Sequence, residues 1–278
     1  MTTKIKIIGN PGQQPIDILK TWLEESLKKF NLIYPEIYLI FVENTQQVKR
    51  VCQRYTKIFS SGDSSNAEII FGQLSATAYF HENIRKEGVP PIILVNKRGE
   101  VFEDDFLDEV AHMREEKNGW LKIEEEAFEL VSSDYVIILD TLTWLCLFFW
   151  LRNQFHDFFS SETMCQYGLI DETLKEKQRK LNHWIKNIFS LEKKSKIDDF
   201  NLVMAAALWI TLPPSYTQKE DEEKLEEIVI NYIRQMAMEA EYRKIKSIIA
   251  QLESPPRVSN IYKCGSEIIE LAQEFLEK

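Results

Sequence analysis

The sequence predicts an α+β fold, in which an N-terminal mixed β-sheet with helices is followed by an all-helical C-terminal half. The first 105 residues alternate short apolar runs with amphipathic segments of helical period, whereas almost nothing after Trp120 has a strand pattern. The chain has 278 residues, of which 44% are hydrophobic, enough for a substantial core. We therefore expect an α/β domain over residues 1–133 and a helical domain over residues 134–278.

The N-terminal half contains four runs with strand character, separated by turn residues and helical patterns. The first run ends in a Gly-Asn-Pro-Gly turn at residues 9–12, and Pro15 opens the helix that follows. Asn44 and Thr45 suit the N-terminal cap of the next helix. The predicted strands are residues 4–8, 37–42, 67–71 and 91–96, and the predicted helices are residues 15–30, 45–59 and 75–86.

The C-terminal half has helical periodicity throughout. Its most apolar run, residues 135–151, contains Asp140, and a membrane span needs about 20 apolar residues. A buried helix of the protein core is therefore the better interpretation, and we expect no membrane insertion. The predicted helices are residues 121–131, 134–159, 171–189, 198–212, 220–252 and 259–276, with 220–252 the longest.

Charge and cysteine usage narrow the class of protein. With 44 acidic and 34 basic residues the formal charge is −10, which argues against a nucleic-acid-binding protein. The four cysteines are far apart without a C-x-x-C pair, as in reduced, mostly buried thiols, and the first residues lack a signal-peptide pattern. These features predict a cytoplasmic protein.

The most informative stretch is residues 103–120, which follows the predicted strand 91–96 and has a helical pattern. It contains Asp108-Glu109-Val110-Ala111-His112, one letter away from the zinc-binding sequence His-Glu-x-x-His. Residues four apart share a helix face, so Asp108 and His112 can reach one metal ion while Glu109 lies beside them. This spacing predicts a metal-binding helix.

The order of these elements resembles the core of small zincin-like metallopeptidases of the gluzincin type, over roughly residues 35–130. The resemblance implies a Zn²⁺ ion, with His112 as the second histidine ligand and Glu109 as the general base that deprotonates a zinc-bound water. It also implies a third ligand on the following helix, where Glu125 and Glu126 in the Glu124–Glu126 group are the candidates. Asp108 departs from the family pattern, because it occupies the position of the first histidine.

That departure predicts a degenerate site. An aspartate is shorter than a histidine, and its negative charge weakens zinc as a Lewis acid. If the site is inactive, the former cleft is expected to bind a peptide or protein partner by strand addition at the sheet edge. Two alternatives remain: Asp108 and His112 form an ordinary pair on a solvated face, or the chain is a non-catalytic interaction protein without metal that presents the acidic helix 220–252.

The other histidines have simpler interpretations. His81 is expected at a surface helix end, with a role as a missing ligand as the alternative. His156, beside Asp157, is expected to be partly buried at the end of the apolar helix, and a chain reversal there is the route by which it could approach the motif helix. His183 is expected on a helix surface. Phosphate-loop, dinucleotide and G-x-S-x-G motifs are missing, and no motif specifies an oligomeric state.

Overall fold

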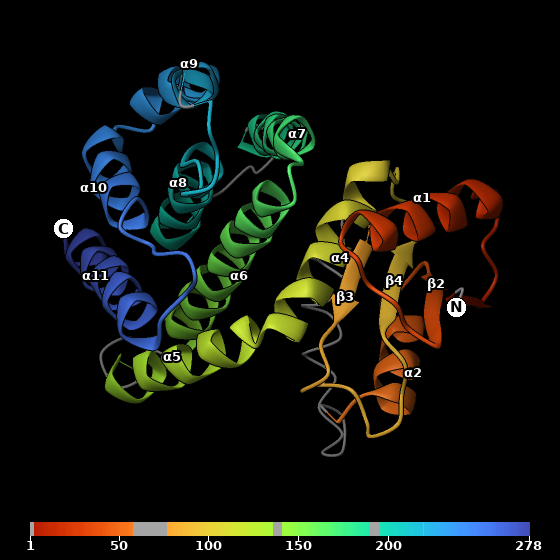
Figure 1. Cartoon of the computed structure of the whole chain (residues 1–278). Helices are drawn as coiled ribbons and strands as arrows, with labels where there is room; N and C mark the ends of the chain where they lie inside the picture. The colour runs from red at the N-terminus through yellow and green to blue at the C-terminus, as the bar shows by residue number, and fades with distance from the viewer. Residues whose placement is uncertain (1–2, 58–76, 136–140, 189–194, 219) are drawn as a thin grey trace. The chain divides into compact units, whose positions relative to one another are not determined.

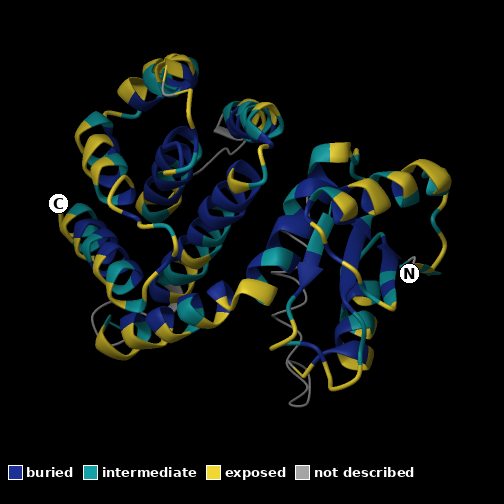
Figure 2. Ribbon diagram, in the orientation of Figure 1, coloured by how far each residue is buried: buried dark blue, intermediate teal, exposed yellow. Residues whose placement is uncertain are grey.

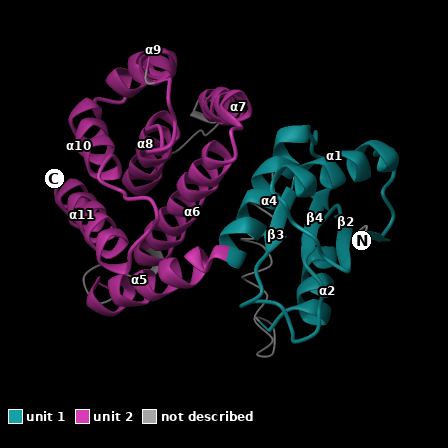
Figure 3. Ribbon diagram, viewed as in Figure 1, with its two compact units in different colours: residues 1–117 teal, residues 118–278 magenta. Residues whose placement is uncertain are grey.

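A computed structural model describes residues 3–57, 77–135, 141–188, 195–218 and 220–278 (Figure 1). The chain divides into two compact units, Met1–Lys117 and Asn118–Lys278 (Figure 3). The first contains a mixed four-stranded sheet with helices, and the described part of the second is built from helices. The predicted α+β class is confirmed. The predicted strand 67–71 lies outside the described residues.

The sheet of the first unit has the order β1-β2-β4-β3. Neighbours β1, β2 and β4 run parallel, and β3 runs antiparallel to β4 with Thr77 opposite Val95. The central strand β4 is apolar and buried along almost its whole length, as expected of a strand covered on both faces. The strands are β1 (Lys4–Ile8), β2 (Glu36–Val42), β3 (Thr77–Phe80) and β4 (Ile92–Asn96).

Helices α1 and α2 of the first unit bury one face each, whereas α4 is buried around most of its circumference. Asn44 caps α2 by accepting a hydrogen bond from the backbone N–H of Gln47. From α2, Val48 and Cys52 pack on one sheet face, in a cluster that includes Leu94 of β4. The helices are α1 (Ile16–Lys29), α2 (Thr45–Tyr55) and α4 (Glu103–Asn118).

The predicted helix over residues 75–86 is wrong in its described part, because Thr77–Phe80 is strand β3 and turns follow it. Tyr79 and Phe80 are aromatic residues that favour strands, and Phe80 pairs with Ile92 of β4. The pairing partner lies more than ten residues away in the chain, so a local helical pattern could not show it.

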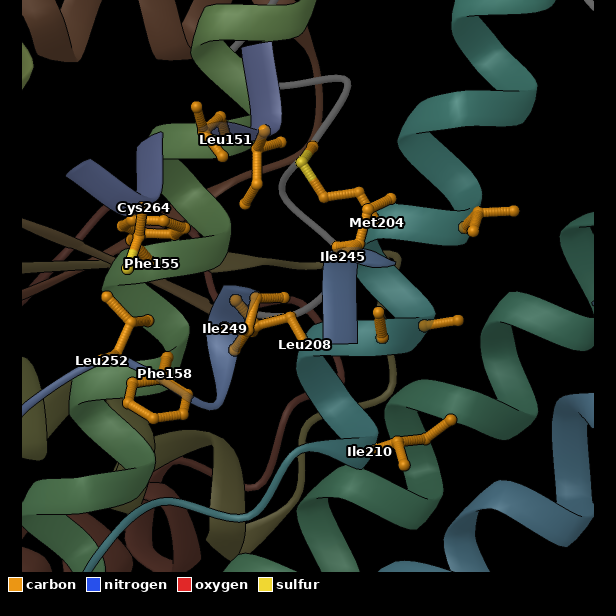
Figure 4. Close-up of a cluster of buried hydrophobic side chains, with 14 of the residues drawn as sticks. Leu151, Phe155, Phe158, Met204, Leu208, Ile210, Ile245, Ile249, Leu252 and Cys264 are labelled. Carbon is orange, nitrogen blue, oxygen red and sulfur yellow. The ribbon is translucent and has the colours of Figure 1, made fainter. Parts of the chain in front are cut away.

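The second unit is organised around α8, which contacts α6, α7, α9, α10 and α11. Nearly all of α8 is buried, and Ser195 and Asp198 form a capping box at its start. Figure 4 shows Phe155 of α6 in one hydrophobic cluster with Met204 and Leu208 of α8. Buried residues of these helices are dark blue in Figure 2. The helices are α5 (Trp120–Tyr135), α6 (Thr141–Gln166), α7 (Ile170–Ile188), α8 (Lys196–Ile210), α9 (Glu220–Gln235), α10 (Glu239–Ile249) and α11 (Val258–Glu277).

The predicted long helix 220–252 is wrong, because it is two helices, α9 and α10. Ala237 has a φ of 57°, and the backbone N–H groups of Ala237 and Met238 bond to the carbonyls of Arg234 and Ile233. This is a Schellman end, which usually contains glycine, so the sequence carries no signal for it. None of the described helices is both long and apolar enough to cross a bilayer.

Candidate metal site on helix α4

Helix α4 begins with three acidic residues, which the positive end of the helix dipole favours. Asp105 caps the first turn by accepting a hydrogen bond from the Phe102 N–H at 2.8 Å. Two side-chain contacts fasten α4 to β3: Thr77 donates to Glu109 at 2.9 Å, and the Tyr79 hydroxyl donates to Glu116 at 2.8 Å. The motif helix therefore lies beside the antiparallel strand of the sheet.

Asp108, His112 and Glu115 form a group on one side of α4. The Nδ1 atom of His112 lies 3.0 Å from Glu115 Oε2, and its Nε2 atom lies 3.8 Å from Asp108 Oδ1. His112 is 6% exposed, Glu115 is fully buried, and Asp108 is half-buried. The expectation of a solvated face is therefore wrong, while an ordinary pair of Asp108 and His112 without metal stays an alternative.

This geometry suits a metal-binding imidazole. When Nδ1–H donates to a carboxylate, the lone pair is on Nε2 and the ring is held in one orientation, the usual arrangement behind a metal-bound histidine. Two ligand atoms about 2.0–2.2 Å from a zinc ion lie about 3.3–3.6 Å apart in a tetrahedral site. The 3.8 Å between His112 Nε2 and Asp108 Oδ1 is close to that separation.

Glu109, the expected general base, lies on the β3 side of α4. Burial raises the pKa of Glu109 to about 8; His112 opposes that rise, the Asp108 carboxylate adds to it, and the Thr77 hydroxyl opposes it. The side chain is therefore mostly a neutral acid at pH 7. A bound divalent cation nearby would favour its charged form.

One turn after His112, Glu116 belongs to a different kind of cluster. Its two oxygens accept from the Arg85 guanidinium at 3.1 Å, the Tyr79 hydroxyl and the Glu82 N–H at 2.7 Å. Arg85 also lies over the Tyr79 ring, 5.7 Å from its centroid. A buried carboxylate is here compensated by a fixed cation and two neutral donors, which describes a structural ion pair.

The sequence candidates for the third ligand lie on α5, in the second unit. Glu125 is half-buried and forms an ion pair with Arg152 at 3.4 Å, and Glu126 is exposed. Their neighbour Glu124 is 3% exposed, and its Oε2 atom lies 3.2 Å from Nδ1 of His156 on α6. The role of Glu125 or Glu126 as a zinc ligand stays a prediction.

The remaining histidines follow the simpler interpretations in part. His183 is exposed on α7, as predicted, and His156 is half-buried, as predicted. His81 is not at a helix end, since it follows β3 and its ring lies 5.5 Å from that of Tyr79. Sequence reasoning missed Glu115, whose spacing of three from His112 was a usable signal, and the Glu124–His156 pair, which brings together residues 32 positions apart.

Comparison with protein-family models, with curated proteins and with solved structures finds no match to this chain. The resemblance to zincins therefore depends on the motif and on the order of elements around it. The candidate site has to be judged by its own geometry.

Proposed function

We propose that the first unit is a zincin-like domain in which α4 binds a zinc ion through Asp108 and His112. The observation that carries this proposal is the orientation of His112, whose Nδ1 faces the buried Glu115 while Nε2 faces Asp108. A carboxylate behind the imidazole and a second ligand atom in front of it are the features of a metal-binding histidine.

The proposed protein is a degenerate member of the metallopeptidase type that does not hydrolyse peptides efficiently. With Asp108 in place of a histidine, the ion carries less effective positive charge, so its water is a weaker acid. A less acidic water on the ion lowers the rate at which that water attacks a carbonyl.

The proposed partner is an extended peptide or protein segment that adds to the sheet at β3. Among the described strands β3 is the last in the sheet order, and it is antiparallel to its neighbour. Strand addition supplies main-chain hydrogen bonds without any need for catalysis. The hydrogen bond from Thr77 of β3 to Glu109 of α4 supports this choice of strand, because it joins β3 to the turn of α4 that carries Asp108 and His112.

Zinc titration of the full chain tests the metal part of this proposal. Protein freed of metal by chelation and without a histidine tag is titrated calorimetrically with ZnCl₂, as wild type, His112→Ala and Asp108→Asn. The expected result is the loss of one bound zinc equivalent in His112→Ala, relative to wild type, and weaker binding of that equivalent in Asp108→Asn. His183→Ala is the matched control, because His183 is exposed on α7, and it is expected to bind as wild type does. Equal zinc binding by wild type and His112→Ala would contradict the proposal.

A peptidase assay tests the second part. The zinc-loaded wild type is incubated with a mixed peptide library, and the products are identified by mass spectrometry. We expect intact peptides, and a subset of extended peptides retained on the protein in pull-down. Zinc-dependent cleavage that His112→Ala abolishes would show an active enzyme instead.

A further inference from the structure

Glu124 is a buried carboxylate in the second unit whose charge has little compensation. One oxygen, Oε2, lies 3.2 Å from Nδ1 of His156, and the other, Oε1, has no hydrogen-bond partner among the described residues. The residue is 3% exposed. Burying a carboxylate oxygen without a partner is costly, so a positively charged ligand at this position would be favourable.

The surroundings of Glu124 are apolar on both sides along the helix axis. One turn before it, the Trp120 ring lies 6.3 Å from the Phe159 ring, and one turn after it, the Phe128 ring lies 5.6 Å from the Phe155 ring. Trp120, Glu124 and Phe128 are spaced by four, so they share one face of α5 and pack against α6. The carboxylate and His156 are thus a polar pair within an aromatic interface.

The same unit shows how it satisfies a buried carboxylate when the role is structural. Glu162, which is fully buried on α6, accepts hydrogen bonds from the Ser215 N–H, the Ser215 hydroxyl and the Gln166 amide at 2.9, 2.6 and 2.8 Å. Three neutral donors cover both of its oxygens. Glu124 has one imidazole for one oxygen, so its environment differs from that of a structural acid.

The distance between the two groups fits ligands of one ion. Two atoms bound to zinc at about 2.0–2.1 Å in tetrahedral geometry are about 3.3–3.4 Å apart, and Nδ1 and Oε2 are 3.2 Å apart. The uncovered Oε1 adds a second oxygen on the same carboxylate. Imidazole with carboxylate is a donor set for zinc and its first-row divalent neighbours.

We infer that Glu124 and His156 are ligands of a divalent transition-metal ion, with zinc as the preferred ion. This inference goes beyond the proposed function, because it assigns ligands on α5 and α6 and rests on none of the residues of α4. It also selects Glu124, and not Glu125 or Glu126, as the metal-binding acid of the Glu124–Glu126 group. A cation here compensates the carboxylate that the protein leaves uncovered.

Calorimetric titration of the metal-free full chain with ZnCl₂ tests this inference. Glu124→Gln and His156→Ala are each expected to lose a bound equivalent or to bind zinc at least tenfold more weakly than wild type. The matched controls are Glu126→Gln, an exposed acid two residues along the same helix, and His183→Ala, an exposed histidine; both are expected to titrate as wild type. Zinc binding by Glu124→Gln and His156→Ala that equals that of wild type would overturn the inference.

The zinc titrations distinguish a failure of this inference from a failure of the proposed function. If only His112→Ala weakens zinc binding, the result supports the site on α4 and overturns the inference about α5 and α6. If only Glu124→Gln and His156→Ala weaken zinc binding, the result supports the inference about α5 and α6 and contradicts the site on α4.

A second readout covers variants that fail to fold, as circular dichroism would show. The wild type labelled with ¹⁵N-histidine has four imidazoles, and the His81→Ala and His183→Ala variants help to assign their signals. Addition of ZnCl₂ is expected to shift the Nδ1 signal of His156 to that of a metal-bound nitrogen. An Nδ1 signal that keeps its protonated, hydrogen-bonded position at saturating zinc would mean a plain histidine–glutamate hydrogen bond and would overturn the inference.

Discussion

Two clusters one turn apart on α4 use buried charge differently. Around Glu116, a guanidinium, a phenol and a backbone N–H all donate to the carboxylate. Around His112, the contacts at Nδ1 and Nε2 are both to carboxylates, Glu115 and Asp108. The contacts of Glu116 are those of a structural ion pair. The contacts of His112 are those on which the proposed metal site depends.

Arg85→Ala should have the largest effect and should separate the two clusters. Removal of one partner of a buried ion pair leaves the Glu116 charge uncompensated, so we expect the free energy of unfolding to fall by about 3–5 kcal/mol. Zinc affinity should stay as in wild type. Urea unfolding and zinc titration measure the two quantities.

The matched control for this change is Arg152→Ala. Arg152 is exposed in its pair with Glu125, so its loss should cost about 0–1 kcal/mol. An equal cost for both arginine variants would remove the distinction between a closed structural network and an exposed pair.

Asp108→His should strengthen zinc binding on α4. The change replaces a short anionic ligand by the imidazole of the complete motif. Mutation of a residue that only hydrogen-bonds to a metal ligand changes metal affinity by about 10–100-fold. For the ligand itself we expect zinc affinity to rise on the order of 100-fold. Competition with a fluorescent zinc chelator measures the affinity. No gain at micromolar zinc would count against the ligand geometry of α4.

Glu115→Gln should have a smaller effect on the same site. The amide oxygen of glutamine still accepts the His112 Nδ1–H, but without the negative charge that makes the imidazole a better donor. We expect zinc affinity about tenfold lower, at the low end of the range for such changes. Affinity unchanged in Glu115→Gln would mean that Glu115 does not act through His112.

Parts of the fold and of the candidate site could be predicted from the sequence alone, and other parts could not. The nearness of Asp108 and His112 was predictable because a helix places residues four apart on one face. The α+β class was predictable because the periodicity changes after Trp120. Strand β3 was not, since its pairing with β4 is tertiary. The end of α9 at Ala237 was missed because a non-glycine residue adopts the left-handed conformation there.

Substitution of Lys177 in the second unit should have the smallest of these effects. It tests whether a buried positive charge lowers the free energy of unfolding. Burial lowers the pKa of Lys177 to about 8, against 10.5 for the free side chain, and Glu176 opposes the shift. Below pH 8 both folded and unfolded chains carry the proton, so the full cost of burial is present. Between pH 8 and 10.5 the unfolded chain binds more protons, so stability rises with pH.

Lys177→Met removes that cost, so we expect it to stabilise the protein at pH 7 by on the order of 1 kcal/mol. The gain is this small because the Thr211 carbonyl, which Lys177 contacts at 3.4 Å, loses a donor. The difference from wild type should shrink as the pH rises from 8 to 10.5. Urea unfolding at pH 7 and pH 10 measures it, and an equal difference at both values would contradict a buried charged lysine.

The most direct test of the metal site on α4 is anomalous X-ray diffraction at the zinc edge from crystals of the full chain grown with ZnCl₂. The account predicts an anomalous peak about 2.0–2.1 Å from His112 Nε2 and about 2.0–2.2 Å from a carboxylate oxygen of Asp108, with Nδ1 of His112 still hydrogen-bonded to Glu115. Density that shows His112 and Asp108 without an ion between them, at full zinc saturation, would contradict it.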